Sequence, residues 1–189
     1  NVLKTEGNFN NEIGMPLTLL KIRDEHEIAV IEMGISFFDE MRRPSKVSKP
    51  DVCVITNIGT CHLENLNDRD GVLKAKTEMF ENAKPNCLTV LNGDDDKLAT
   101  IKEVNGREPV FYGIESNRDI TAFNIEPDGM KGTNCTIKYN DSEFDTYIPI
   151  PGLHMIHNAL AATCIGVHFG MTLDEIDQGI RNLKAIGGR

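Results

Sequence analysis

Two short apolar runs, each followed by polar residues with ligand chemistry, constrain the fold of this chain most strongly. Residues 27–33 hold four apolar residues before Glu32, and residues 51–56 lead into a loop that contains His62. In an open parallel sheet, clefts form where the carboxyl ends of the strands meet the following loops. The pattern therefore predicts that Glu32 and His62 converge on one cleft, with Lys76 facing it from the next helix.

The same alternation of strand and helix patterns continues through the first half of the chain. It predicts an α/β fold with a mostly parallel sheet flanked by helices. From residue 118 to 150, short alternating segments separated by turn residues indicate a small antiparallel subsheet. Two more helices follow, one over 158–167 and one capped by Thr172 that extends to about 183. The predicted strands are 27–33, 51–56, 87–92 and 108–112, and the predicted helices between them are 12–22, 36–46, 69–83 and 94–104.

Length and composition fit one compact domain and exclude several classes of protein. The net charge of -9 over 189 residues argues against a nucleic-acid-binding groove, which normally carries a basic stripe. Five cysteines without a C-x-x-C pair favour a reducing compartment over secretion. No signal-peptide pattern occurs, and no apolar run approaches the roughly 20 residues that span a bilayer. We expect a cytoplasmic protein.

Each polar residue at a strand exit also has a plainer interpretation. A carboxylate such as Glu32 is often a helix cap or a solvated turn residue. His62 could be a loop histidine hydrogen-bonded to the backbone, and Lys76 could be an exposed helical lysine. From composition and spacing alone, the prediction ends at an α/β domain with a polar cleft.

Taken together, five motifs resemble the central, ATP-binding domain of the Mur ligases, which has a P-loop-NTPase-like fold. The first motif is typical of the branch that adds D-alanyl-D-alanine to UDP-N-acetylmuramoyl-tripeptide in peptidoglycan synthesis. The motifs are residues 5–20 (TEGNFNNEIGMPLTLL), 32–34 (EMG), 56–66 with 71–78 (TNIGTCHLENL and GVLKAKTE), 92–95 (NGDD) and 152–162 (GLHMIHNALAA).

The resemblance implies a catalytic metal site. A carboxylate matching Glu32 holds the Mg²⁺ that binds the ATP phosphates, and a histidine matching His62 contributes to a second Mg²⁺. A carbamylated lysine matching Lys76 completes the second site, because the carbamate supplies the oxygen ligands that magnesium prefers. The implied reaction transfers a phosphoryl group from ATP to the peptide carboxylate, and D-alanyl-D-alanine then attacks the acyl phosphate.

The resemblance also implies contacts with the two substrates. Residues Asn92, Asp94 and Asn158 would contact the adenosine part of ATP. Residues Asn10, Asn11 and Thr18 would lie toward the UDP-muramoyl peptide, and Arg189 would lie near the junction with the last domain of the family. Met155 stands where many relatives have asparagine, which weakens the expected adenine contact there.

One expected element is missing from the sequence. No G-x-x-x-x-G-K-[ST] phosphate loop occurs within the chain. We therefore expect residues 1–189 to be a central domain that lacks the upstream phosphate-loop segment and both flanking domains. Two alternatives remain open: a related amide ligase, such as a folylpolyglutamate or cyanophycin synthetase, and a non-catalytic Mur-like nucleotide-binding or scaffolding module.

Overall fold

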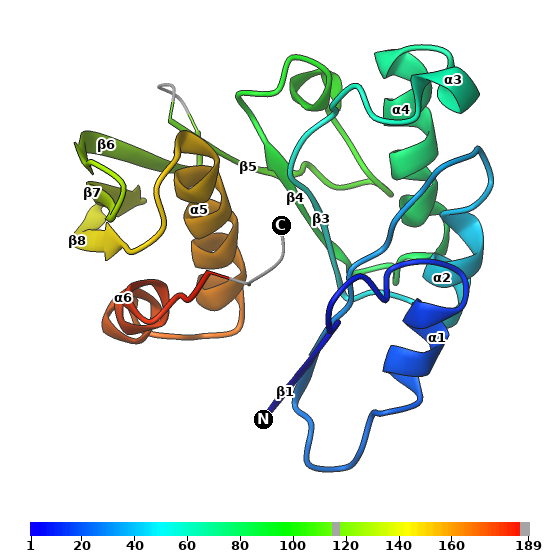
Figure 1. Ribbon diagram of the computed structural model, residues 1–189, viewed down its shortest axis with the longest axis horizontal. Helices are drawn as coiled ribbons and strands as arrows, with labels where there is room; N and C mark the ends of the chain where they lie inside the picture. The colour runs from blue at the N-terminus through cyan, green and yellow to red at the C-terminus, as the bar shows by residue number, and fades with distance from the viewer. Residues whose placement is uncertain (115–117, 186–189) are drawn as a thin grey trace. The chain divides into compact units, whose positions relative to one another are not determined.

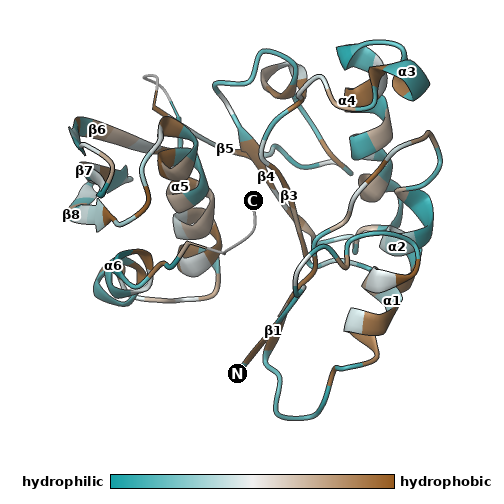
Figure 2. Cartoon of the chain, viewed as in Figure 1, coloured by the Kyte–Doolittle hydropathy of each residue, from teal (hydrophilic) through white to brown (hydrophobic). Residues whose placement is uncertain are grey.

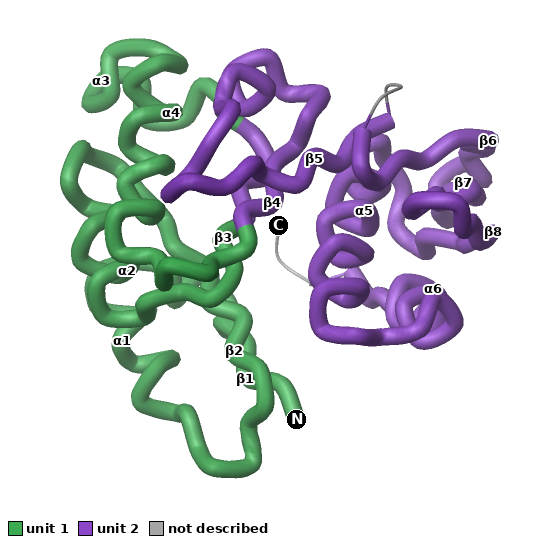
Figure 3. Tube along the Cα trace, turned by 180° about the vertical axis from the view of Figure 1, so that it is seen from behind, with its two compact units in different colours: residues 1–53, 58–88 green, residues 54–57, 89–189 purple. Residues whose placement is uncertain are grey.

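The computed structural model describes residues 1–114 and 118–185. The chain divides into two compact units, coloured separately in Figure 3. Unit 1 comprises residues 1–53 and 58–88, and unit 2 comprises residues 54–57 and 89–189. Strands β3 (Val52–Ile55) and β4 (Leu88–Asn92) contribute residues to both units.

Unit 1 begins with a two-stranded parallel sheet. Strand β1 (Val2–Lys4) pairs with β2 (Ile28–Val30), with Val2 opposite Ile28. Strand β2 is the central part of the predicted strand 27–33, whereas β1 was not predicted. The helical elements of the unit are α1 (Gly14–Leu19), α2 (Arg42–Ser48), α3 (Leu63–Leu66), α4 (Arg69–Thr77) and the 3₁₀ helix η1 (Glu78–Asn82).

The predicted helix over 36–46 was wrong in its first half. The backbone amides of Ser36 and Phe37 donate to Glu40 Oε2 at 2.6 and 3.1 Å, and Asp39 has a φ of 67°. A left-handed residue and a side chain that binds nearby amides both favour a loop over a helix. This loop, residues 35–40, therefore leads into α2, and Glu40 accepts from its amides at Ser36 and Phe37.

Unit 2 contains most of a six-stranded mixed sheet in the order β3-β4-β5-β6-β7-β8. Strand β5 (Val110–Gly113) pairs in parallel with both β4 and β6 (Ile120–Asp128). Strands β6, β7 (Gly132–Tyr139) and β8 (Ser142–Ile148) are antiparallel, which confirms the predicted subsheet over 118–150. The fold class predicted from the sequence, a mostly parallel sheet flanked by helices, is confirmed.

Two helices complete unit 2. Helix α5 (Leu153–His168) packs against β5 and β6, and α6 (Leu173–Arg181) packs against β8 (Figure 1). Apolar residues colour much of β3, β4 and α5 in Figure 2, and the buried side chains of α5 include Ile156 and Leu160. Thr172 caps α6 in a capping box with Glu175, as its position in the sequence predicted.

The predicted helix over 94–104 was wrong. It is replaced by one 3₁₀ turn, η2 (Leu98–Thr100), and a tight turn at Asn105 and Gly106, both of which have positive φ. Asp95 Oδ1 accepts from the backbone amides of Lys97 and Leu98 at 3.0 Å each. Such local side-chain bonds compete with helix propagation.

Within the described residues, no helix is long and apolar enough to cross a membrane.

Candidate active site

Unit 1 contains a cavity of about 230 Å³. Its wall combines the motif after β1, the loop after β2 and the histidine before α3, so three separate sequence motifs meet there. The lining residues are Asn10, Asn11, Glu12, Gly34, Ile35, Ser36, Glu40, Pro44 and His62.

Asn10 joins the first motif to the second. Its Nδ2 donates to Glu32 Oε1 at 2.9 Å, and its backbone carbonyl accepts from Gly34 N at 2.7 Å. A Cβ added at Gly34 would lie 3.3 Å from Asn10 Cγ and Oδ1, so only glycine lets the two segments approach this closely without displacement. The Glu32 amide donates to Thr5 Oγ1 at 2.9 Å. Glu32 is therefore held from both its backbone and its side chain, and the carboxylate is bonded to a residue that lines the cavity.

Asn11 and Thr18 have structural bonds in this arrangement. Asn11 Oδ1 accepts from the amides of Ile13 and Gly14 at 3.1 and 2.8 Å, which satisfies donors at the start of α1. Thr18 is 2% exposed, and its hydroxyl donates to Gly14 O at 3.1 Å. Asn11 lines the cavity, whereas Thr18 lies in the interior and would reach a ligand only if α1 moved.

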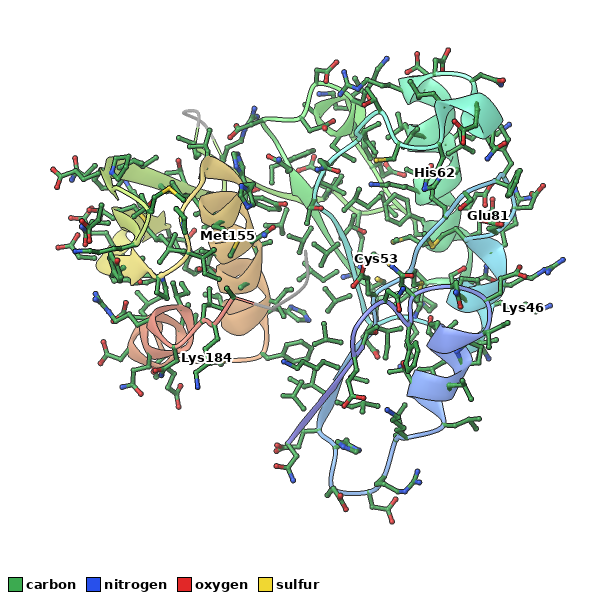
Figure 4. The ribbon with its side chains drawn as sticks, in the orientation of Figure 1. Lys46, Cys53, His62, Glu81, Met155 and Lys184 are labelled. Carbon is green, nitrogen blue, oxygen red and sulfur yellow. The ribbon has the colours of Figure 1, made fainter. Side chains whose placement is uncertain are left out.

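His62 lies at the cavity in a left-handed conformation, with a φ of 59° (Figure 4). It is exposed and directly precedes α3. Lys76 lies half-buried on α4, and the residues that line the cavity do not include it. His62 therefore lines the cavity, and Glu32 is bonded to Asn10, which also lines it, whereas Glu32 and Lys76 are not themselves lining residues. The convergence of the three side chains on one cleft stays a prediction.

A close approach fixes α4 to α3. A Cβ added at Gly71 would lie 1.7 Å from the carbonyl oxygen of Leu66, so position 71 requires glycine. Asp68 caps α4 by accepting from Gly71 N at 2.8 Å. Arg69 Nε also donates to Ile58 O at 2.9 Å. These contacts hold the short segment that carries His62 to the helix that carries Lys76.

The predicted adenosine residues belong to unit 2, at the exit of β4 and the start of α5. Asn92 is 8% exposed. Its Nδ2 donates to Thr56 O at 3.0 Å, and its Oδ1 accepts from Asp94 N at 3.0 Å. Asn92 thus fixes the turn after β4 with both ends of its amide group.

Asp94 is the centre of a polar network. Its Oδ2 accepts from Ile114 N at 2.6 Å and lies 3.0 Å from His157 Nε2. Its Oδ1 lies 3.4 Å from Arg118 Nε, and the side chain is 13% exposed. A carboxylate with this many protein donors is held rigidly.

His157 connects the network to α5. Its Nδ1 lies 3.2 Å from Leu153 O, while its Nε2 faces Asp94. Both partners are acceptors, so the ring makes both bonds only when each nitrogen carries a hydrogen. Neither His157 nor Arg118 was predicted as a site residue. His157 stands within the motif over 152–162, directly before Asn158, whereas Arg118 had no sequence signal.

Asn158 is exposed on α5, and its Nδ2 lies 3.6 Å from Met155 Sδ. Of the three predicted adenosine residues, it therefore presents its side chain most openly. The predicted site residue Arg189 lies outside the described residues.

The chain belongs to the Mur ligase family. The Mur ligase middle domain matches residues 1–166. The motifs at the cavity and at the exit of β4 both lie within this match.

Particular relatives within the family match the chain over its whole length. It is 37% identical to the UDP-N-acetylmuramoyl-tripeptide--D-alanyl-D-alanine ligase of Escherichia coli over all of this chain and 42% of the relative. A crystal structure of MurF from Acinetobacter baumannii superposes with a TM-score of 0.92 at 31% identity, covering 100% of this chain and 41% of that one. MurF ligase from Thermotoga maritima in complex with ADP gives a TM-score of 0.86 at 29% identity, covering 100% and 43%. The chain thus spans about two fifths of the length of these relatives.

Proposed function

We propose that this chain is the central part of an ATP-dependent amide ligase that joins D-alanyl-D-alanine to UDP-N-acetylmuramoyl-tripeptide. The observation that carries the proposal is the full-length similarity to ligases of that name, together with the cavity formed by their shared motifs. Because the chain spans about two fifths of those relatives, we propose that a phosphate loop and two further domains belong to the same polypeptide.

The reaction has two steps. The peptide carboxylate attacks the γ-phosphorus of ATP, and the bond from that phosphorus to the β-phosphate oxygen breaks. ADP departs, and the peptide carries an acyl phosphate. The amino group of D-alanyl-D-alanine then attacks the acyl carbon, and inorganic phosphate leaves as the amide bond forms. Positioning and charge neutralisation carry most of such a reaction, so the task of this chain is to bind and orient.

The donors in unit 1 fit magnesium. Glu32 offers a carboxylate whose orientation Asn10 fixes, and His62 offers an imidazole at the cavity that Asn10 also lines. No group of three or more potential His, Cys, Asp or Glu ligands occurs among residues 1–114 and 118–185. The Glu32 carboxylate is nevertheless a ligand of the kind that Mg²⁺ uses, since that ion is usually held by one or two carboxylates and substrate phosphates. When bound, the ions would neutralise phosphate charge in a protein of net charge -9.

Lys76 would serve as a magnesium ligand after carbamylation. Carbon dioxide adds to its neutral amine, a proton is released, and the cation becomes an anionic oxygen donor. The support is its place in the motif after His62 and the rigid α3 to α4 junction at Gly71. Neutral lysine is needed for this addition.

The two substrates would be bound by different units. In unit 2, Asn158 would contact the adenosine part of ATP directly. Asn92 and Asp94 would shape the turn after β4, and that turn would contact the nucleotide. The ADP bound to the Thermotoga maritima relative supports a nucleotide as ligand. In unit 1, Asn10 and Asn11 would face the UDP-muramoyl peptide, with Thr18 supporting α1 and Arg189 lying toward the next domain.

An assay of the full-length protein tests the function. It would receive UDP-N-acetylmuramoyl-tripeptide, ATP, Mg²⁺ and D-alanyl-D-alanine, and phosphate release and product mass would be measured. We expect a product heavier by one dipeptide less water, formed only when all four components are present. Phosphate release that is indifferent to the dipeptide, or a product made with a single amino acid instead, would contradict the proposal.

A further inference from the structure

Two cysteines of unit 1 lie in contact. Cys53 on β3 and Cys87, directly before β4, have their sulfur atoms 3.6 Å apart (Figure 4 labels Cys53). Cys53 is 2% exposed and Cys87 is 9% exposed. The Leu88 amide donates to Asp51 O at 2.9 Å, so a backbone hydrogen bond joins the starts of β3 and β4 near the two cysteines. We call Cys53 and Cys87 the dithiol pair.

The dithiol pair differs from the other cysteines of the chain. Cys135 and Cys164 are buried singly, and burial raises their thiol pKa values to about 11 and about 12. In the dithiol pair, the hydrogen bond between the thiols lowers the pKa of Cys87 and raises that of Cys53. The charge of Lys84 also lowers the pKa of Cys87. The charge of Asp51, which forms an ion pair with Lys84 at 2.7 Å, raises it. One sulfur of the pair is thus the better nucleophile.

Access is available beside Cys87. The three residues before it, 84–86, are exposed, and Cys87 N closes their turn by donating to Lys84 O at 2.9 Å. Cys87 is 9% exposed against 2% for Cys53, so Cys87 is the sulfur of the pair that a small oxidant would reach first. Cys53, inside the strand, is shielded from direct attack and is placed to react only with its neighbour.

We propose that the dithiol pair is an oxidation site at which a peroxide converts two thiols into a disulfide within the chain. The Cys87 thiolate attacks one peroxide oxygen, the O–O bond breaks, and the departing oxygen takes a proton and leaves as water. This gives a sulfenic acid at Cys87. Cys53 then attacks that sulfur, the S–O bond breaks, and the oxygen leaves as a second water with the proton that Cys53 gives up.

Two electrons leave the pair of sulfurs and reduce one peroxide, so the step balances. A disulfide is about 2.05 Å long, so the sulfurs must approach by about 1.5 Å. The bond would enclose residues 54–86, the segment that carries His62 and Lys76. This inference does not depend on the proposed function, since it rests only on contacts within unit 1.

The test treats the reduced protein with hydrogen peroxide, denatures it, and alkylates the remaining thiols with N-ethylmaleimide. Mass spectrometry should show loss of two of the five alkylated thiols and a cross-linked peptide joining Cys53 to Cys87. The variant C164S is the matched buried control and should still lose two. In C53S no cross-link should form, and dimedone should label Cys87 as a sulfenic acid.

Three results would overturn the proposal. One is retention of all five alkylated thiols after peroxide treatment. Another is a cross-link that involves Cys61, the exposed cysteine, in place of Cys87. The third is dimedone labelling of C87S at Cys53 that equals the labelling of C53S at Cys87. The wild-type result alone decides the first two, so misfolding of a variant leaves the proposal falsifiable.

Discussion

The polar residues at the strand exits are used differently in the two units. In unit 1, Glu32 and His62 are exposed, His62 lines the cavity, and Asn10, another lining residue, orients the Glu32 carboxylate from one side. In unit 2, Asn92 and Asp94 are turned into the protein, where Ile114 N and His157 contact Asp94. Similar sequence positions are therefore exposed in one unit and form an internal polar network in the other.

The largest expected effect concerns ATP binding. The 189-residue chain lacks a phosphate-loop sequence, and each charge-assisted hydrogen bond from such a loop contributes on the order of 1.5 to 3 kcal/mol. Loss of two would weaken binding by roughly two to four powers of ten. Calorimetric titration of this chain should therefore find weak ATP binding and no hydrolysis. The same titration of a longer protein that includes the loop should find tight binding. Equal and tight binding by both would mean that unit 2 alone builds the nucleotide site.

Lys76→Ala in the full-length ligase should lower product formation by roughly 100- to 1,000-fold, the effect of removing one preorganised electrostatic group. A short carboxylic acid should restore part of the activity by occupying the place of the carbamate oxygens. Lys74→Ala is the matched control on the same helix, where the ammonium lies 5.5 Å from the Phe38 ring. Wild-type turnover of Lys76→Ala without rescue would leave Lys76 as an ordinary helical lysine.

Asn10→Ala should lower activity by roughly 10- to 100-fold, the range for residues that orient a metal ligand. Most of the loss should be recovered by raising the Mg²⁺ concentration, since the Glu32 carboxylate remains but is no longer oriented. The free energy of unfolding should fall by about 0.5 to 1.5 kcal/mol, because the half-buried side chain loses its hydrogen bond to Glu32. A loss that no magnesium concentration relieves would show that Asn10 acts on something other than the metal ligand.

Unlike Asn10→Ala, Asp94→Asn should mainly change the stability of the fold. It removes charge from a carboxylate that is 13% exposed and faces the Arg118 guanidinium and the His157 ring. The free energy of unfolding should therefore fall by roughly 1 to 3 kcal/mol. Asp141→Asn, at an exposed turn, is the matched control and should be neutral. Urea denaturation of the chain measures both. Unchanged stability together with lost ATP affinity would identify Asp94 as a ligand contact and remove the contrast between the units.

The sequence predicted the order of strands and helices because apolar periodicity reports burial directly. It failed where side chains bind nearby backbone. Asp95 stops a helix after β4, and Glu40 delays α2, and neither effect changes the apolar pattern. Strand β1 is only three residues long, too short for a periodic signal.

The site was predicted less completely than the fold. The structure pairs β2 with β1 and places β3 in the six-stranded sheet, so the rule that parallel strands end at one edge of a sheet does not by itself bring Glu32 and His62 together. The Asn10 to Glu32 bond joins residues 22 apart, and the bond between Asp94 and His157 joins residues 63 apart, so only the folded chain brings these partners together. That is also why Asp94 could be predicted as important but not as the centre of an internal network.

The most direct test of the metal site in unit 1 replaces Mg²⁺ with Mn²⁺ and records amide spectra of the chain with ATP present. Paramagnetic broadening reports distance from the ion and needs no catalytic turnover. We predict that it is strongest at Glu32, Gly34 and His62, and that Glu32→Gln weakens it at all three. Broadening centred on Asp94 and His157, or unchanged by Glu32→Gln, would contradict the account.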